Sequence, residues 1–256
     1  MPRVLSVFFG LMLCSPAWAP VWAITGSAPP ASGFAARPIV MIVDARGDLC
    51  TGTALAPDLV LTAAHCVTAK LGYSVKTFQG GPSIAVRGLA LHPRFNAASY
   101  AASRATADVA LLKLASPLTE LVMPASLAPA RNVAVGEELT IAGFGVTAAG
   151  TARGLGLPRM ATLSVTGKPG SLQIRLYDLA TRNRRAGLGA CTGDSGGPVF
   201  DGESGQGIGQ VIGIVSWTTA PNDEEGCGGL TGVTPLINYR AWVVETARKL
   251  NSPLAP

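Results

Sequence analysis

The segment at 193–198, with the sequence GDSGGP, carries the residues best suited to perform chemistry. A serine hydroxyl is a weak nucleophile at neutral pH because it stays protonated, so Ser195 needs an imidazole to accept its proton. The flanking glycines leave room for a substrate carbonyl and let backbone N–H groups converge on an oxyanion. Ser195 is therefore interpreted as an activated nucleophile.

The chain has 2 histidines, so few side chains can serve as the base. His65 lies in the segment TAAHC at 62–66, which on its own fits a hydrogen-bonded core histidine equally well. His92 lies in LHPRF at 91–95 and is interpreted as structural. Asp108 opens an otherwise apolar run, where an unpaired carboxylate is costly. A place beside an imidazole explains that carboxylate.

The N-terminal segment is typical of a secretory signal peptide. A short basic start is followed by an apolar run at 4–13, which is too short to span a bilayer. We predict a signal peptide at 1–23, because cleavage after Ala19 would place Pro20 beside the scissile bond. The net charge of +5 is spread along the chain, so it favours neither nucleic acid nor a membrane anchor. The expected product is secreted or periplasmic, and monomeric.

The cysteines indicate disulfides and no metal. Cys14 would leave with the signal peptide, and an even number then remains, which are Cys50, Cys66, Cys191 and Cys227. Four cysteines in an exported chain favour two bridges, with three pairings open. Spacing typical of a zinc site is absent from the sequence.

The remaining pattern is that of an all-β protein. Short apolar and β-branched runs alternate with turns, supplied by 31 glycines and 19 prolines. The runs predicted as strands are 39–43, 59–62, 83–91, 109–114, 139–142, 160–165, 171–176, 211–217 and 232–234. One helix is expected from Asn238, its proposed N-cap, with an apolar face that includes Trp242. Residues 97–107 are interpreted as a plain surface loop, and 124–130 as a crossing linker.

Three segments together resemble the trypsin/chymotrypsin family of serine endopeptidases. They are TAAHC at 62–66, DVALL at 108–112 and GDSGGP at 193–198, in the family's order of His, Asp and Ser. Further matches are ITG at 24–26, GFG at 143–145, SW at 216–217 and the closing helix. GDSGG alone also fits the α/β-hydrolases, but those enzymes need a histidine after the serine, and none follows Ser195.

The resemblance implies an all-β fold of two six-stranded Greek-key β-barrels packed together with a C-terminal helix. The protease domain would span 24–256, with the first barrel at about 24–123, the second at about 131–237 and the helix at about 238–250. It also implies two disulfides, Cys50–Cys66 and Cys191–Cys227.

The same resemblance implies a mechanism without metal or organic cofactor. His65 would be the base, Asp108 its orienting carboxylate and Ser195 the nucleophile, with an acyl-enzyme intermediate. The oxyanion hole would use the N–H groups of Gly193 and Ser195. Calcium is not expected, because no Asp or Glu lies between 58 and 108. The partners would be protein or peptide substrates and protein inhibitors.

The family's primary specificity pocket would have Gly189 at its base, without a carboxylate to bind Arg or Lys. We therefore expect small or medium uncharged residues at the cleaved position. Its walls would be Ala190, Ser216, Trp217, Thr218 and Gly232. The acidic run at 223–225 is interpreted as solvated loop charge, with attraction of a basic flanking residue as the alternative.

Activation would follow the family's internal ion pair, in which the freed ammonium of Ile24 pairs with Asp194. Because Ile24 directly follows the favoured signal-peptidase site, export itself would generate the active enzyme. The rival interpretation, from another class, is a catalytically inactive relative kept as a binding module.

Overall fold

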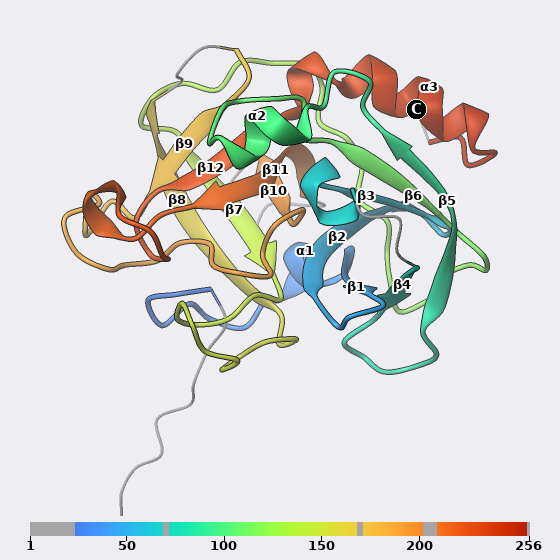
Figure 1. The fold of residues 1–256 in the computed structure, drawn as a ribbon, viewed down its shortest axis with the longest axis horizontal. Coiled ribbons are helices and arrows are strands. Elements are labelled where there is room, and N and C mark those ends of the chain that lie inside the picture. The colour runs from blue at the N-terminus through green and yellow to red at the C-terminus, as the bar shows by residue number, and fades with distance from the viewer. Residues whose placement is uncertain (1–23, 69–71, 168–170, 202–208, 255–256) are drawn as a thin grey trace, which may run out of the picture.

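The computed structural model describes residues 24–68, 72–167, 171–201 and 209–254, so the predicted signal peptide lies outside the described residues. Within these ranges the strands form two closed, six-stranded antiparallel barrels (Figure 1). This architecture confirms the predicted fold class. No helix among the described residues has the length and apolar character needed to cross a bilayer.

The two barrels share one connectivity. The first contains β1 (Ile39–Asp44), β2 (Leu49–Ala56), β3 (Leu59–Thr62), β4 (Tyr73–Lys76), β5 (Ile84–Leu91) and β6 (Ala110–Leu114), in the order β1-β2-β3-β6-β5-β4. The second contains β7 (Glu138–Gly143), β8 (Arg159–Gly167), β9 (Ile174–Tyr177), β10 (Pro198–Asp201), β11 (Gln210–Thr218) and β12 (Thr231–Pro235), in the order β7-β8-β9-β12-β11-β10. Closure pairs every strand on both edges, which removes exposed sheet edges.

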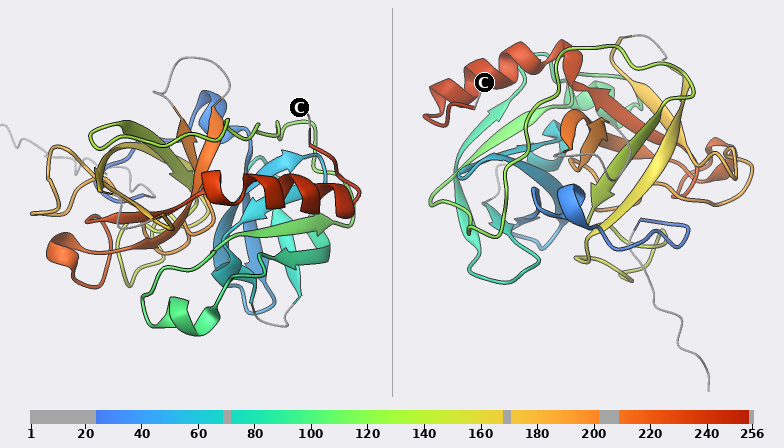
Figure 2. Two further views of the ribbon diagram at one scale, coloured as in Figure 1. Left: turned by 90° about the horizontal axis from the view of Figure 1, so that it is seen from above. Right: turned by 180° about the vertical axis from the view of Figure 1, so that it is seen from behind.

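The helical elements are short except for the last. They are α1 (Gly33–Ala36), α2 (Ala97–Ala101) and α3 (Arg240–Lys249), with 3₁₀ turns η1 (Ala64–Val67), η2 (Pro221–Asp223) and η3 (Leu236–Asn238). Although α3 follows the second barrel in sequence, it lies along the first (Figure 2). Lys113 of β6 binds the segment after α3, because its ammonium donates to the carbonyl of Asn251 at 3.1 Å. The same ammonium donates to Asp58 at 2.5 Å.

Three apolar cores hold the fold together. One fills the first barrel, around Val60 and Leu112, and another fills the second, around Leu163 and Val199. The third lies between the barrels and joins residues of both to Val243 of α3. Because burial of apolar surface stabilises this third core, the two barrels are held in one relative position. A site built from both barrels is thereby given a fixed geometry.

Sequence reasoning missed the strands β2, β4 and β10. In β2 the sequence LCTGTALA is rich in small residues, and six of its eight positions are buried, so neither strong hydrophobicity nor alternation marks it. Strands β4 and β10 have only four residues each. A short strand gives a weak pattern, and pairing with its neighbours decides its conformation.

Two expectations about helices are wrong. The helix α3 is present, but Tyr239 precedes its first residue and Asn238 belongs to η3, where its amide donates to the carbonyl of Ser171. The segment 97–107 is more than a plain loop, because it contains α2, capped by the Asn96 side chain, which accepts from Ser99 N at 2.8 Å.

Candidate active site

Neighbouring strand ends in the first barrel bring His65 and Asp108 together. Strand β3 pairs with β6, so that Thr62 lies opposite Ala110. His65 follows β3 in the turn η1, and Asp108 precedes β6 by two residues. Nδ1 of His65 lies 2.8 Å from Oδ2 of Asp108, and the His65 backbone N–H donates to Oδ1 at 2.9 Å. This contact fixes Nδ1 as the bonded nitrogen and leaves Nε2 on the opposite side of the ring.

Asp108 is 1% exposed, and three donors stabilise its charge. Besides the two groups of His65, the hydroxyl of Ser216 donates to Oδ2 at 2.6 Å. A buried carboxylate is costly unless it is paired and hydrogen-bonded, and this one is both. The arrangement suits a carboxylate that orients an imidazole and stabilises its cation.

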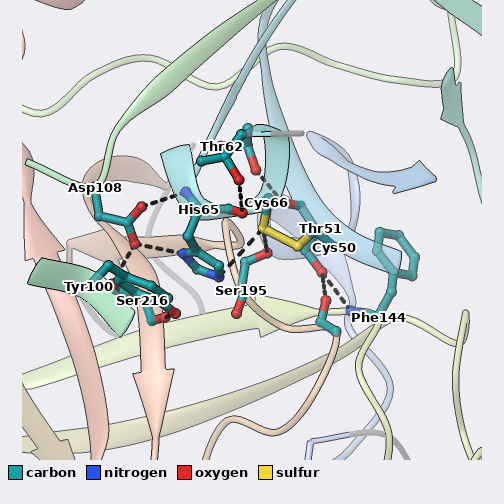
Figure 3. Close-up of a disulfide and its surroundings, with 12 residues drawn as sticks. Cys50, Thr51, Thr62, His65, Cys66, Tyr100, Asp108, Phe144, Ser195 and Ser216 are labelled. Atoms are coloured by element: carbon teal, nitrogen blue, oxygen red, sulfur yellow. Dashed lines mark hydrogen bonds and ion pairs between the residues drawn. A yellow bond between two sulfur atoms is a disulfide. The ribbon is translucent and has the colours of Figure 1, made fainter. Parts of the chain in front are cut away.

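Ser195 comes from the second barrel, in the loop that leads into β10. Figure 3 shows it beside the imidazole of His65, and the sulfur of Cys66 lies 3.7 Å from both Nε2 of His65 and the carbonyl oxygen of Ser195. The backbone N–H of Thr51, in β2, donates to that carbonyl at 2.9 Å. The site therefore lies at the junction of the two barrels.

We call the segment at 191–197 the nucleophile loop, after the predicted nucleophile Ser195. It packs tightly against the first barrel. At Gly196, with φ +82°, a Cβ atom would lie 2.1 Å from Oγ1 of Thr62, so no larger residue fits. The hydroxyl of Thr51 donates to the carbonyl of Gly193 at 2.8 Å, which fixes the direction of that peptide. Within the described part of the chain, the N–H groups of Gly193 and Ser195 donate to no protein acceptor. Both remain available to an oxyanion.

Asp194 is the second buried carboxylate of the site, at 1% exposure. It accepts hydrogen bonds from the backbone N–H groups of Gly145 and Cys191, each at 2.8 Å. A Cβ atom on Gly145 would lie 2.6 Å from the Asp194 carboxyl carbon, so this glycine gives the carboxylate its space. Burial raises the pKa of Asp194 to about 7, although both hydrogen bonds oppose the rise.

The segment that begins at Ile24 packs into the second barrel. Ile24 is fully buried and belongs to the core of that barrel. The backbone N–H of Thr25 donates to the carbonyl of Gly189 at 3.1 Å, and its hydroxyl donates to the carbonyl of Gly187 at 2.9 Å. The N-terminal segment thus pairs with the loop segment that carries Gly189, through an isolated β-bridge between Thr25 and Gly189.

Both predicted disulfides are present. Cys50–Cys66 joins β2 to the turn that carries His65, and Cys191–Cys227 joins the nucleophile loop to the segment before β12. Loop closure by such bridges contributes about 3–4 kcal/mol each in the chain-entropy model. They restrain the two segments whose geometry the site needs.

Gly189, which carries no side chain, is the residue predicted at the base of the pocket beside Ser195. The hydroxyl of Thr218 donates to the carbonyl of Ala190 at 2.8 Å, and the N–H of Ala190 donates to the hydroxyl of Thr231 at 3.0 Å. The Thr231 hydroxyl would also lie 3.5 Å from a Cβ on Gly189. Thr218 of β11 and Thr231 of β12 thus both contact the segment at 189–190, and their side chains narrow the space beside it.

Gly232 and Trp217 lie together in the sheet. They are paired across β11 and β12, and a Cβ atom on Gly232 would collide with the indole ring at 1.9 Å. The structure places Gly232 beneath the ring of Trp217, while its neighbour Thr231 faces Gly189.

A cleft of about 540 Å³ continues from Ser216 and Trp217 towards α2. Arg104 and Arg175 line it, and the guanidinium of Arg175 lies 5.9 Å from the centre of the Trp217 ring. Asp223, from the acidic run at 223–225, also lines the cleft and accepts from the side chain of Asn183 at 2.9 Å. The lining of the cleft therefore includes charges of both signs.

His92 is buried between Tyr239 and Trp242, with ring centres 4.9 Å apart in each case. Burial, with a smaller contribution from Arg94, lowers the pKa of this imidazole. These contacts fit the structural role expected of it.

Among the described residues, one group has possible metal-binding atoms close together. It consists of Cys50, His65 and Cys66, whose ligand atoms lie within 4.8 Å of one another. The two sulfurs are bonded to each other, and metal binding needs thiolates. These side chains therefore fit no metal.

Three residues of the site were not predicted from the sequence. Thr51 anchors the nucleophile loop, Thr231 faces the pocket base, and Tyr100 packs against His65. Thr51 lies in β2, which was not predicted, and Thr231 lies just before the predicted run 232–234. Tyr100 is the one aromatic residue of the alanine-rich segment at 97–107. That aromatic residue was the available signal.

The fold and this site define a chymotrypsin-like two-barrel protein, and comparison with known proteins agrees. The family model described as Trypsin matches residues 26–243, so the chain belongs to the trypsin family of serine proteases. It is similar to human kallikrein-15, with 29% identity over 78% of this chain and 82% of the relative. It is also similar to trypsin from Sarcophaga bullata (28%, covering 80% and 82%) and to the snake venom serine protease rhinocerase 4 from Bitis rhinoceros (27%, covering 81% and 81%).

Proposed function

We propose that this protein is an exported serine endopeptidase with His65, Asp108 and Ser195 as its catalytic triad. The observation that carries the proposal is the 2.8 Å contact between Nδ1 of His65 and Asp108, with Ser195 beside the same imidazole. Members of the trypsin family act on protein or peptide substrates, and the cleft beside Ser216 suits an extended peptide.

In the proposed reaction, Oγ of Ser195 attacks the peptide carbonyl while Nε2 of His65 accepts its proton. The negative charge that develops on the carbonyl oxygen would be stabilised by the N–H groups of Gly193 and Ser195. His65 then gives its proton to the leaving amine, and an acyl-enzyme remains. A water molecule then attacks the acyl-enzyme while Nε2 of His65 accepts its proton, and His65 returns that proton to Oγ of Ser195 as the acid product leaves.

We further propose a preference for small or medium uncharged side chains at the cleaved position. The uncharged base at Gly189 and the hydroxyls of Thr218 and Thr231 support this preference, because they reduce the space and offer no carboxylate. Cleavage of a peptide library should therefore favour residues such as Ala or Val over Arg and Lys. A large preference for Arg in the wild type would contradict this assignment of the pocket.

The proposed location is secreted or periplasmic, with activation by signal peptidase. Two observations support this proposal: Ile24 is buried in the core of the second barrel, and Asp194 has only backbone partners among the described residues, so an ammonium on Ile24 would give it a charged partner. N-terminal sequencing of the active exported protein should begin at Ile24. Full activity in a form that begins at Pro20 would contradict the proposal.

Labelling with a fluorophosphonate tests the proposed function directly, because the reagent modifies only an activated serine. The wild type should be labelled at Ser195, and Ser195→Ala should not. His65→Ala should abolish labelling nearly as completely, and the double variant should lose little more activity, because the residues act as a unit. A folded wild type that fails to react would instead indicate a catalytically inactive binding module.

A further inference from the structure

Tyr100, the aromatic residue of α2, stacks flat on the imidazole of His65. The ring centres are 4.3 Å apart and the ring planes differ by 10° (Figure 3). Tyr100 thus covers one face of the side chain that must exchange protons with Ser195. A face-to-face contact restricts the tilt of the imidazole, since any rotation out of the common plane would collide with the phenol.

The hydroxyl end of Tyr100 is anchored to the same network. It donates to the carbonyl of Ser216 at 3.0 Å, and the hydroxyl of Ser216 donates to Asp108 at 2.6 Å. Asp108 contacts Nδ1 of His65 at 2.8 Å, and His65 stacks on Tyr100. The four residues therefore form a closed ring of contacts around the base, drawn from α2, β11, η1 and the chain before β6.

The segment that presents Tyr100 is itself well held. Asn96 caps α2 through Ser99, and the backbone N–H of Asn96 donates to the hydroxyl of Thr106 at 2.8 Å. The ring of Phe95 packs on Tyr100, with centres 6.4 Å apart. Burial and the nearby charge of Asp108 raise the pKa of the Tyr100 phenol, so it stays a neutral donor throughout the range in which histidine titrates.

We propose that Tyr100 is a positioning residue, which holds the His65 imidazole in the plane that links Asp108 to Ser195 and favours the protonated form of the ring. The inference rests on the proposed function of the triad. The second effect follows from the negative face of the phenol, which attracts a cation placed over it within about 6 Å. The intermediate steps of the reaction need that cation.

The other groups that face His65 stay constant when Tyr100 is replaced. Asp108 is the charged group in contact with the imidazole, and the disulfide sulfur of Cys66, Ser195 and Ser216 are its uncharged neighbours. A change in the pH dependence of Tyr100 variants therefore reports the loss of the stacked ring.

The test is the rate of fluorophosphonate labelling as a function of pH, since this small reagent does not need the extended cleft. We compare the wild type with Tyr100→Leu, which removes the aromatic face, and Tyr100→Phe, which keeps it and loses only the hydroxyl. With Leu, the midpoint of the pH–rate profile should fall by about 0.5 units, and the limiting rate about tenfold. With Phe, the midpoint should stay at the wild-type value.

The outcomes separate this inference from the function on which it rests. If the wild type is not labelled, the proposed function itself is wrong. A labelled wild type with an unchanged midpoint and limiting rate in Tyr100→Leu would show that Tyr100 is only a wall of the cleft. Should the leucine variant fail to fold, Tyr100→Met removes the aromatic face with a more flexible side chain, and the same two readings apply.

Discussion

Two carboxylates of the site, Asp108 and Asp194, are equally buried, and their surroundings differ. Asp108 is bonded to the side chains of His65 and Ser216, whereas Asp194 has only the backbone N–H groups of Gly145 and Cys191 among the described residues. The side-chain partners of Asp108 come from both barrels, His65 from the first and Ser216 of β11 from the second. Asp194 is held in an apolar site that raises its pKa to about 7.

The difference teaches how a buried charge can serve catalysis or control it. A carboxylate with permanent partners orients a base, while one without a charged partner makes the surrounding loop depend on a partner that arrives later. The loop that contains Asp194 also carries the N–H groups of Gly193 and Ser195, which would form the proposed oxyanion hole. We therefore expect replacements at the two carboxylates to have different consequences.

The largest effect is expected at Asp108. Asp108→Asn keeps the size of the side chain but favours the wrong tautomer of His65, so kcat should fall about 10⁴-fold, with the fold retained. Peptide hydrolysis and circular dichroism measure the two quantities. A loss below tenfold in a folded variant would mean that Asp108 does not orient the base.

The next effect is a dependence of stability on pH in the chain that retains residues before Ile24. Because folding raises the pKa of Asp194 above its ordinary value of 3.8, this group contributes stability that is fully present below pH 3.8 and is lost as the pH rises through about 7. The loss should be on the order of 4 kcal/mol.

Chemical denaturation at pH 4 and pH 7.5 measures this difference in a Ser195→Ala background, which prevents self-cleavage. Other carboxylates titrate as well, so the matched control is the same chain with Asp194→Asn. The result is the loss of unfolding free energy between pH 4 and pH 7.5 in the chain with Asp194, minus the loss in the control. Equal losses in the two chains would contradict the conclusion that Asp194 lacks a charged partner.

A third effect concerns the N-terminus. Freed Ile24 should supply the ammonium that Asp194 lacks. We therefore expect a form that begins at Ile24 to have a kcat/KM about 100-fold higher than a form that begins at Ala23. This factor corresponds to about 3 kcal/mol, as for a broken buried ion pair. Assays of the two purified forms, with the start of each checked by mass spectrometry, decide the matter. Equal activity would separate Asp194 from activation.

The smallest effect is expected at Ser216, which donates to Asp108 at 2.6 Å. Ser216→Ala removes one of three donors and leaves His65 in place, so kcat should fall about tenfold, the lower range for a hydrogen bond to a charged group. Thr219→Ala, on the same side of the cleft, is the control and should leave kcat within twofold of the wild type. A loss as large as that of Asp108→Asn would mean that Ser216 has a role beyond its bond to Asp108.

Much of the site was predictable because its chemistry is concentrated in short segments. The histidine, aspartate and serine motifs stand out by residue type and order, and the family resemblance that they carry implied the two barrels and both disulfides. The strand β2 was not predictable, since its small residues give no pattern, and Thr51 was missed with it. The cap of α3 was assigned to Asn238 on residue type, but the amide of Asn238 bonds to Ser171 instead.

The sequence by itself determined which groups are available for catalysis and which fold class positions them. Local residue types are enough for that, because a nucleophilic serine, a single suitable imidazole and a carboxylate in an apolar run have few other uses together. Only the tertiary structure decided which residues surround these groups. The stack of Tyr100 on His65, the approach of Thr231 to Gly189 and the bond from Thr51 to Gly193 each join segments distant in sequence. Such contacts depend on how the closed barrels pack against each other, and no local pattern encodes that packing.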